Sequence, residues 1–412
     1  MKLTTPSSET TGPLPLAGIR VLDLSTTFSG PYCTHLLAHF GAEVIKLEPP
    51  SGDISRTRGT ARNPSMASIF LTLNAGKRSI VVDMKSAGGQ EVFRRLCGTA
   101  DVLVHNMRAS ATERISADYA TVSKINPQIV YAGIAGYGHT GRYAGAPAYD
   151  DIIQAMSGLA DLQGNLTPTH EPTYVASAVA DKVGGMAAAM AILAALHRRN
   201  AEGVGSEVEV PMLEVVTGFT LLEHLAGQQF RPAVGPAGYV RMLTPRRRPY
   251  KTADGYLAVM PYTGRHWESF LNHIGRGDLL SDPLFSTEET RAENSAALYE
   301  ILEEALLHDA NEGWLERLRA LDVPAMPVHT MDTVFEDPHL VDVDFFQQLT
   351  HPSEGEIIQM RSGITFDRTP PITPLAPAQR LGQSTNDVLA EIGFTPEEID
   401  ELRTSASVAG VE

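Results

Sequence analysis

The chain has 412 residues, 43% of them hydrophobic and 20% charged, a balance typical of a soluble globular protein with two or three domains. Its formal net charge of −16 argues against a general nucleic-acid binder, because recognition of phosphates needs clustered Lys and Arg. The only cysteines, Cys33 and Cys97, exclude a disulfide scaffold and a cysteine-based metal site, and we expect both to be reduced.

Residues 1–15 are polar and rich in Ser, Thr and Pro, so we expect them to be disordered. This start lacks the apolar centre of a signal peptide, and no apolar run approaches transmembrane length. We therefore expect a cytoplasmic protein without a membrane partner.

The next stretch predicts a strand–helix–strand unit. An apolar run over residues 19–24 predicts a strand, residues 32–40 a helix, and residues 43–48 a second strand. Parallel strands need such a crossover helix, so the unit predicts the α/β fold class. The G-x-G-x-x-G fingerprint of a dinucleotide site is absent from the loop between the first strand and the helix, and we reject such a site.

The same alternation continues to about residue 228. Further strands are predicted over residues 80–83, 102–104, 129–132 and 207–210, with helices between them. Ligands of open α/β sheets bind where the strands end, so the residues just after these strands are candidates for a binding site. Those that offer polar side chains or glycine backbone are Lys85, His105, Asn106, Gly136 and Gly138.

We expect three parts in the chain. Residues 16–228 form the N-terminal part of a large α/β domain, residues 229–325 a smaller α+β domain, and residues 326–412 a C-terminal part that returns to the large domain. The boundary near 229 rests on a Pro-, Gly- and Arg-rich stretch. The smaller domain is predicted to hold a strand over 256–260 and helices over 266–274, 296–307 and 313–321; near the end an extended segment over 370–377 precedes helices over 384–393 and 396–403.

Asp181 stands between a small apolar run and the pair Gly184–Gly185, just before a predicted buried helix over residues 186–199. The local pattern predicts an N-cap, since free backbone N–H groups and the helix dipole favour a carboxylate there. The small neighbours also leave room for a ligand, and a carboxylate can attack an activated acyl group. Both interpretations stay open at this level. We interpret Asp23 as structural, and Asp150 and Asp151 as helix caps.

Other catalytic patterns are missing from the sequence. There is no G-x-S-x-G elbow of a serine hydrolase and no metal-binding His or Cys spacing, so we expect no metal. Several cations lie near strand ends. Each one alone is interpreted as a solvated surface charge, but together they could hold an anionic, phosphate-bearing ligand. They are Arg56, Lys77, Arg78, Lys85, Arg108 and Arg114.

A series of short stretches follows in a characteristic order along the chain: 21–24, 29–31, 40–48, 51–53, 74–79, 83–85, 100–106, 136–138, 157–158, 180–186, 322–324, 327–328 and 380–382. With these stretches in this order, the sequence resembles the class III CoA-transferase family, which includes the α-methylacyl-CoA racemases. The resemblance runs from about residue 16 to 403. It implies a Rossmann-like large domain built from both ends of the chain, a smaller α+β domain, and an interlocked homodimer.

The resemblance implies a covalent mechanism at Asp181. The carboxylate attacks an acyl-CoA thioester to give an aspartyl–acyl anhydride, CoA thiolate converts this to an aspartyl-CoA thioester, and CoA finally passes to an acceptor carboxylate. CoA and acyl-CoA are substrates in this scheme, and no cofactor is permanently bound.

Positions that hold CoA in the family match mainly polar and glycine residues of this chain, but three positions depart from the formyl-CoA transferase pattern. Phe28, Pro49 and Ala135 stand where that subgroup has Gln, Arg and Lys, which argues against oxalate or formyl substrates. Arg56 and Arg108 are candidates to compensate, and the run 246–248 is a candidate phosphate contact. The implied CoA-binding residues are Ser29, Val82, Lys85, Asn106, Met107, Arg108, Arg114, Gly136 and Tyr137.

Tyr149 decides between the two main functions. Racemases pair the Asp with a His at this position, and a Tyr with its ordinary pKa near 10 is a poor base at neutral pH. We therefore expect a transferase that moves CoA from an acyl-CoA, plausibly succinyl-CoA, to another carboxylic acid. A 2-methylacyl-CoA racemase and a non-catalytic CoA-binding protein remain the alternatives.

Overall fold

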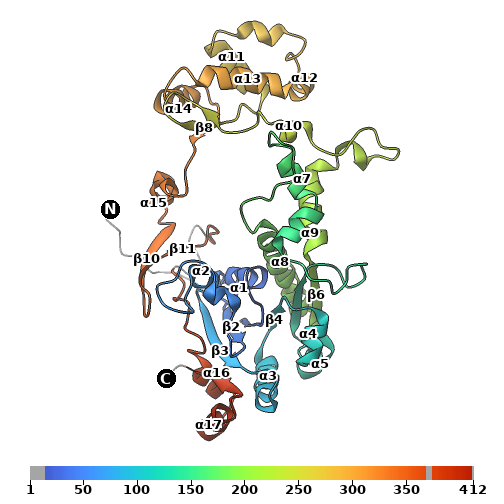
Figure 1. Ribbon diagram of the computed structural model, residues 1–412, viewed down its shortest axis with the longest axis vertical. Coiled ribbons are helices and arrows are strands. Elements are labelled where there is room, and N and C mark those ends of the chain that lie inside the picture. Colours follow the sequence, from blue (N-terminus) through green and yellow to red (C-terminus); the bar gives the residue numbers. More distant parts are fainter. Residues whose placement is uncertain (1–13, 368–373, 411–412) are drawn as a thin grey trace. The chain divides into compact units, whose positions relative to one another are not determined.

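The computed structural model describes residues 14–367 and 374–410. Most of the expected disordered start, and the first half of the 370–377 segment, lie outside these residues. Two compact units are present (Figure 1), and each is described by itself: the first comprises residues up to 157, 176–217 and from 338 onward, and the second comprises residues 158–175 and 218–337.

A seven-stranded sheet forms the centre of the first unit, with the strand order β12-β3-β2-β1-β4-β5-β6. Its long apolar strands pair in parallel, and only the short β12 runs antiparallel, beside β3. The predicted α/β class is therefore confirmed. The strands are β1 (Arg20–Asp23), β2 (Glu43–Glu48), β3 (Lys77–Val82), β4 (Val102–His105), β5 (Val130–Ala135), β6 (Ser206–Pro211) and β12 (Val408–Ala409).

The strand order places a switch point between β1 and β4. The chain builds outward from β1 through β2 to β3, and then returns to lay β4 on the other side of β1. At such a point the crossover helices leave on opposite faces of the sheet. The crevice outside the carboxyl ends of the two strands is where ligands of open α/β sheets bind.

Alternate side chains of the strands serve two cores. Val21 of β1 packs with α1 (Ser29–His39) and α8 (Val179–Glu202) on one face, and Leu22 packs with α3 (Ala87–Thr99) and α17 (Pro396–Thr404) on the other, as the two-residue period of a strand requires. A two-stranded hairpin lies in the same unit. The other elements of this unit are η1 (Ile54–Thr57), α1 (Ser29–His39), α2 (Ser68–Leu73), α3 (Ala87–Thr99), α4 (Ala109–Arg114), α5 (Tyr119–Ile125), α6 (Asp150–Met156), α8 (Val179–Glu202), α15 (Pro338–Asp342), α16 (Thr385–Glu391), α17 (Pro396–Thr404), β10 (Phe346–His351) and β11 (Gly355–Met360); α9 (Met212–His224) spans the boundary between the units.

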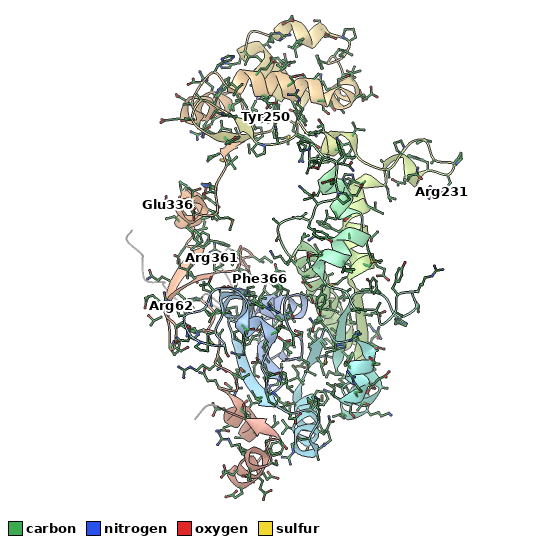
Figure 2. The ribbon with its side chains drawn as sticks, viewed as in Figure 1. Arg62, Arg231, Tyr250, Glu336, Arg361 and Phe366 are labelled. Carbon is green, nitrogen blue, oxygen red and sulfur yellow. The ribbon has the colours of Figure 1, made fainter. Side chains whose placement is uncertain are left out.

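The second unit is helical with a small antiparallel sheet, in the order β7-β8-β9. Aromatic rings of Trp267, Phe270, Tyr299 and Trp314 are buried in its core. Tyr250, on β7, is buried with them and is labelled in Figure 2. Its elements are α7 (Leu159–Gly164), η2 (Ala226–Gln229), α10 (Val240–Leu243), β7 (Tyr250–Lys251), β8 (Tyr256–Val259), α11 (Gly264–His273), η3 (Gly277–Ser281), α12 (Glu288–Glu293), α13 (Ser295–Leu306), α14 (Asn311–Ala320), β9 (Ala325–Pro327) and η4 (Thr333–Glu336).

The helix predicted over residues 186–199 begins earlier than expected. Helix α8 starts at Val179, so Gly184 and Gly185 lie inside it rather than before it. The reason is close packing: a Cβ on Gly185 would lie 2.5 Å from the backbone oxygen of Ser29 in α1. Tight contact between two helices outweighs the low helix propensity of glycine.

Helix α8 is also the one helix in the described part of the chain that is long and apolar enough to cross a membrane, by length and composition alone. The expectation that no apolar stretch reaches this length was therefore wrong. A core helix of a soluble protein has the same properties, and α8 buries Ala188, Ile192 and Leu196 in the first core. The length and apolar composition of α8 are therefore only weak evidence for a membrane-spanning helix.

Replacing Gly185 with Ala is expected to destabilise the protein by about 1–3 kcal/mol, because the new methyl group meets backbone rather than a flexible side chain. The matched control is Gly218→Ala on α9, where nothing lies within 4 Å of the new Cβ and the higher helix propensity of Ala should stabilise by up to about 1 kcal/mol. Urea unfolding of both variants measures the difference. Equal effects of the two substitutions would contradict a close contact at Gly185.

Candidate active site

Asp181 lies at the edge of the sheet where the parallel strands end. Helix α8 leads into β6, which pairs in parallel with β5, so α8 runs opposite to the strands and its first turn reaches their carboxyl ends. Asp181 is the third residue of α8, and the N-cap is Ala178, which makes no side-chain capping bond. The predicted N-cap role of Asp181 was therefore wrong.

The hydroxyl of Ser29, at the start of α1, lies near enough to the Asp181 carboxylate to lower its pKa. The structure thus brings together two residues that the sequence assigned to separate roles, the nucleophile and a CoA contact. The short contact between Ser29 and Gly185, one turn further along α8, holds the two helix starts together.

A second carboxylate, Asp150, supports the first turn of α8. Its Oδ1 accepts the backbone N–H of Asp181 at 3.0 Å, and its Oδ2 accepts the side-chain N–H of the buried Gln154 at 2.5 Å. Asp150 is the first residue of α6, whose N-cap is Tyr149. The expected capping role of Asp150 is real, but the helix that it caps is α8.

Burial raises the pKa of Asp181 to about 6, and the nearby Asp150 adds to this rise, while the Ser29 hydroxyl opposes it. At neutral pH the group is still mostly ionised, yet it is more basic than an ordinary aspartate. A nucleophilic carboxylate benefits from both properties, since only the ionised form attacks and a more basic oxygen attacks faster.

Buried ion pairs lie beneath the loop that connects β1 to α1. Asp23 pairs with Lys77 at 3.0 Å, and Lys46 pairs with Asp53 at 2.9 Å. The same groups bind the loop backbone: Asp23 accepts the N–H of Ser25 at 2.9 Å, and Lys46 donates to the carbonyl oxygen of Ser25 at 2.9 Å. All four charged side chains are at most 3% exposed, so they hold the loop and do not meet solvent.

Asn106 fixes the same loop from the other side of the switch point. Its Oδ1 accepts the N–H of Thr26 at 3.0 Å, and its Nδ2 donates to the carbonyl oxygen of Thr26 at 2.7 Å. The next residue, Thr27, has a φ of 72° and donates its N–H to Asp53 at 3.2 Å. These contacts place Ser29, two residues further on, against Asp181.

Two cations expected on the surface are buried instead. Lys77 belongs to the ion pairs beneath the loop, and Arg56 is 1% exposed, with its guanidinium bonded to both carboxylate oxygens of Glu48 at 2.7 Å and lying over the ring of Phe70. The interpretation of both as solvated charges was wrong, and Arg56 cannot replace a missing CoA contact. The sequence shows the cations but not the carboxylates that enclose them.

The expected CoA-binding residues follow β1, β3, β4 and β5. Val82 ends β3 and has its side chain in the second core, whereas Lys85, Arg108 and Arg114 are exposed. Since β2 and β1 separate β3 from β4, the loops after β3 and β4 lie about 14 Å apart at the usual strand spacing. A single ligand touching both loops must be long. The full set that the topology brings to this edge is Ser29, Val82, Lys85, Asn106, Met107, Arg108, Arg114, Gly136 and Tyr137.

Gly136 has a structural reason to be glycine. A Cβ there would lie 2.4 Å from the Cβ of Ala148, so Gly136 allows the loop after β5 to approach the segment that leads to Asp150.

Arg246 and Arg248, in the second unit, pair with Glu300 and Glu303 at 2.6–2.9 Å. Two of the three arginines that were candidate phosphate contacts are therefore already paired with carboxylates.

Two cavities open on the α1 side of the first unit. The larger, of about 590 Å³, lies between the β10–β11 hairpin and the segment around Arg62, and it contains none of the expected site residues. Figure 2 labels Arg62, which donates to the backbone oxygen of Glu354 in the hairpin turn. The smaller, of about 350 Å³, is lined by Phe28 and Lys182, which directly neighbour Ser29 and Asp181 in sequence. Sequence reasoning missed this cavity.

No cluster of three or more His, Cys, Asp and Glu that could hold a metal occurs within residues 14–367 and 374–410.

The fold and site define a doubly wound α/β protein with a partly buried carboxylate at the edge where its strands end. The sequence matches CoA-transferase family III over residues 16–385. The succinate–glutarate CoA-transferase of Agrobacterium fabrum is 31% identical over 391 residues, which cover 92% of this chain and 96% of that protein. The formyl-CoA:oxalate CoA-transferase of Streptomyces coelicolor is 32% identical over 415 residues, which cover 95% and 99%.

A solved structure has a similar fold. The crystal structure of a CaiB/BaiF family protein from Brucella suis matches with a TM-score of 0.76 and 29% identity, covering 92% of this chain and all of that one. The chain belongs to CoA-transferase family III. It is an acyl-CoA:carboxylate CoA-transferase.

Proposed function

We propose that this CoA-transferase works through a covalent intermediate on Asp181, with succinyl-CoA as a plausible donor and another carboxylic acid as acceptor. The observation that supports it is the Asp181 site: a partly buried carboxylate with a raised pKa at a helix start, close to the Ser29 hydroxyl, on a residue whose backbone N–H is bound by Asp150. The name of the Agrobacterium relative supports succinyl and glutaryl groups as substrates.

Each step of the proposed cycle exchanges one bond for another. An Asp181 oxygen attacks the thioester carbonyl, the C–S bond breaks, and an anhydride and CoA thiolate form. The thiolate attacks the aspartyl carbonyl, which releases the donor acid as a carboxylate and leaves an aspartyl-CoA thioester. The acceptor carboxylate attacks this thioester to form a second anhydride and thiolate, and the thiolate then attacks the acceptor carbonyl and frees Asp181. In this cycle, backbone N–H groups of the glycine-rich loops would stabilise the tetrahedral oxyanions.

The experiment that tests the cycle is trapping of the intermediate. Incubation with succinyl-CoA followed by hydroxylamine should convert Asp181 to a hydroxamate, which peptide mass spectrometry locates. A protein that binds CoA without reacting would give no hydroxamate. A 2-methylacyl-CoA racemase would instead exchange the α-proton of its substrate in deuterated water without any acceptor acid.

The rate of transfer is expected to rise with pH through about 6. The pKa of Asp181 is raised to about 6, and only the ionised carboxylate attacks, so the protonated form below that pH is inactive. The acid limb of kcat/KM against pH measures this value. In Asp150→Asn the limb should move to lower pH, because the negative charge that raises the pKa of Asp181 is gone. An unchanged limb would contradict the role given to Asp150.

We also propose a homodimer, which the exposed apolar side chains of α8 support. Met186 and Met190 lie one turn apart on the same face and are 48% and 64% exposed, an arrangement typical of a covered helix face. Light scattering should give about twice the chain mass of 44.5 kDa, and a monomer would contradict this proposal.

A further inference from the structure

Gln154, on α6, is a fully buried polar side chain to which the proposed cycle gives no role. It is 0% exposed and lies four residues after Asp150, so both side chains occupy the same face of the helix. Burying an amide is costly unless hydrogen bonds replace those it makes with water. The partners of Gln154 therefore indicate what this side chain does.

The amide nitrogen of Gln154 has two hydrogens and faces two acceptors. Its Nε2 donates to Oδ2 of Asp150 at 2.5 Å and to the backbone oxygen of Ser177 at 3.3 Å. An ionised carboxylate and a carbonyl oxygen cannot donate, so the amide oxygen cannot take the place of the nitrogen. The side chain thus joins Asp150 to the residue that directly precedes the N-cap of α8.

Asp150 transmits this constraint to the nucleophile. While its Oδ2 accepts from Gln154, its Oδ1 accepts the backbone N–H of Asp181 at 3.0 Å. The N-cap residue Ala178 makes no side-chain bond, so Asp150 satisfies an N–H group that an N-cap side chain would otherwise bind. The contacts from Gln154 through Asp150 therefore fix the backbone from which the Asp181 carboxylate projects.

We propose that Gln154 is a positioning residue for CoA transfer, which holds Asp150 against the backbone of Asp181 and so aims the nucleophile. The inference rests on the proposed covalent function of Asp181. Because Gln154 has no exposed surface, it acts through Asp150 and not on the substrate. A displacement of the attacking oxygen by about 1 Å is enough to slow a reaction about 100-fold.

The first half-reaction tests this role. Enzyme is mixed with succinyl-CoA, and intact-protein mass spectrometry follows the fraction of chains that carry covalently bound CoA. The amplitude counts the folded, reactive sites, and the rate constant gives the rate per site. Gln154→Met keeps the length of the side chain but donates nothing, and it should lower the rate per site about 10- to 100-fold. Calorimetry should show that its affinity for CoA changes less than about threefold.

Two variants separate positioning from stability. Gln154→Glu still donates while it shares one proton with Asp150, because two carboxylates this close do not both ionise near neutral pH. Its rate per site should stay near that of the wild type at pH 6 and fall toward that of Gln154→Met as pH rises to 9. Asn126→Leu is the matched structural control, since the Asn126 amide likewise donates to two acceptors, the backbone oxygens of Cys97 and Ala100. It should lower the melting temperature but leave the rate per site unchanged.

A double substitution shows whether Gln154 acts through Asp150. Adding Gln154→Met to Asp150→Asn should slow the reaction less than about threefold further, because the charged acceptor is already gone. If hydroxylamine trapping finds no adduct on Asp181 in the wild type, the covalent function itself fails. The positioning role alone is overturned if the adduct forms but Gln154→Met reacts at the wild-type rate per site, loses only amplitude or affinity for CoA, or adds its full effect to that of Asp150→Asn.

Discussion

Replacing Asp181 with Asn is expected to abolish CoA transfer and, at neutral pH, to make the protein more stable. Asn keeps the shape of the side chain but cannot form an anhydride. The loss should reach at least about 10⁴-fold in kcat, as for removal of a covalent nucleophile. Hydroxylamine trapping should show no modified residue at position 181.

The gain in stability follows from the raised pKa of Asp181. A carboxyl whose pKa is about 6 in the folded protein and near 4 when unfolded prefers its protonated form in the folded state. Its contribution to stability is fully present below about pH 4 and is lost as pH rises through about 6. At pH 7 the ionised group therefore costs about 2–3 kcal/mol, and Asn removes this cost.

Thermal unfolding across pH measures this effect. The melting temperature of Asp181→Asn should exceed that of the wild type by a few degrees at pH 7.5, and the two should converge near pH 4. Asp151→Asn, on the exposed face of the neighbouring helix start, is the matched control and should leave both transfer and its pH dependence unchanged. Retained transfer in Asp181→Asn would exclude the covalent mechanism, and a lower melting temperature at every pH would show that Asp181 is structural.

The sequence predicts the sheet well because its signals are local. Apolar runs such as the one around Val21, bounded by Gly and Pro, predict buried parallel strands with few alternatives. The helix start at Asp181 was misplaced because the close approach of Ser29 to Gly185 comes from a segment about 150 residues away. Nothing in the local pattern reveals such packing.

The same limit applies to the site. Family resemblance singled out Asp181 and Ser29 separately, and the geometry joined them. The burial of Lys77 and Arg56 could not be predicted, because the local sequence around a cation is the same whether water or a carboxylate surrounds its side chain in the fold. The smaller cavity had no signal in the sequence, because its walls come from α2 and β11 as well as from the starts of α1 and α8.

Replacing Lys77 with Met is expected to be the most destabilising single change in the first unit. Lys77 donates to Asp23 at 3.0 Å, to the carbonyl oxygen of Pro31 at 2.9 Å and to the side-chain oxygen of Asn74 at 3.0 Å. Burial alone would raise the pKa of Asp23, but Lys77 and Lys46 outweigh it and hold that pKa far below its usual range. Met leaves Asp23 buried without its main partner, which costs about 3 kcal/mol or more.

A double substitution separates the loss of the pair from the loss of packing. In Asp23→Asn with Lys77→Met no buried charge is left unpaired at Asp23, since Asn can still accept the N–H of Ser25, so at least half of the lost free energy of unfolding should return. Urea unfolding at pH 7 measures all three variants, with the exposed Lys124→Met as control. A loss below about 1 kcal/mol in Lys77→Met would mean that Lys46 alone compensates Asp23.

The same variants test whether the buried charges act on catalysis through the loop. Asp23 and Lys46 hold Ser25, and the loop continues directly to Ser29, so a loosened loop should weaken the effect of the Ser29 hydroxyl on Asp181. The Ser29 hydroxyl lowers the pKa of Asp181, and loss of this effect should shift the acid limb of kcat/KM to higher pH in Lys77→Met, with partial return in the double variant. A purely structural role would lower the amount of folded enzyme but leave the limb in place, because the surviving sites would be unchanged.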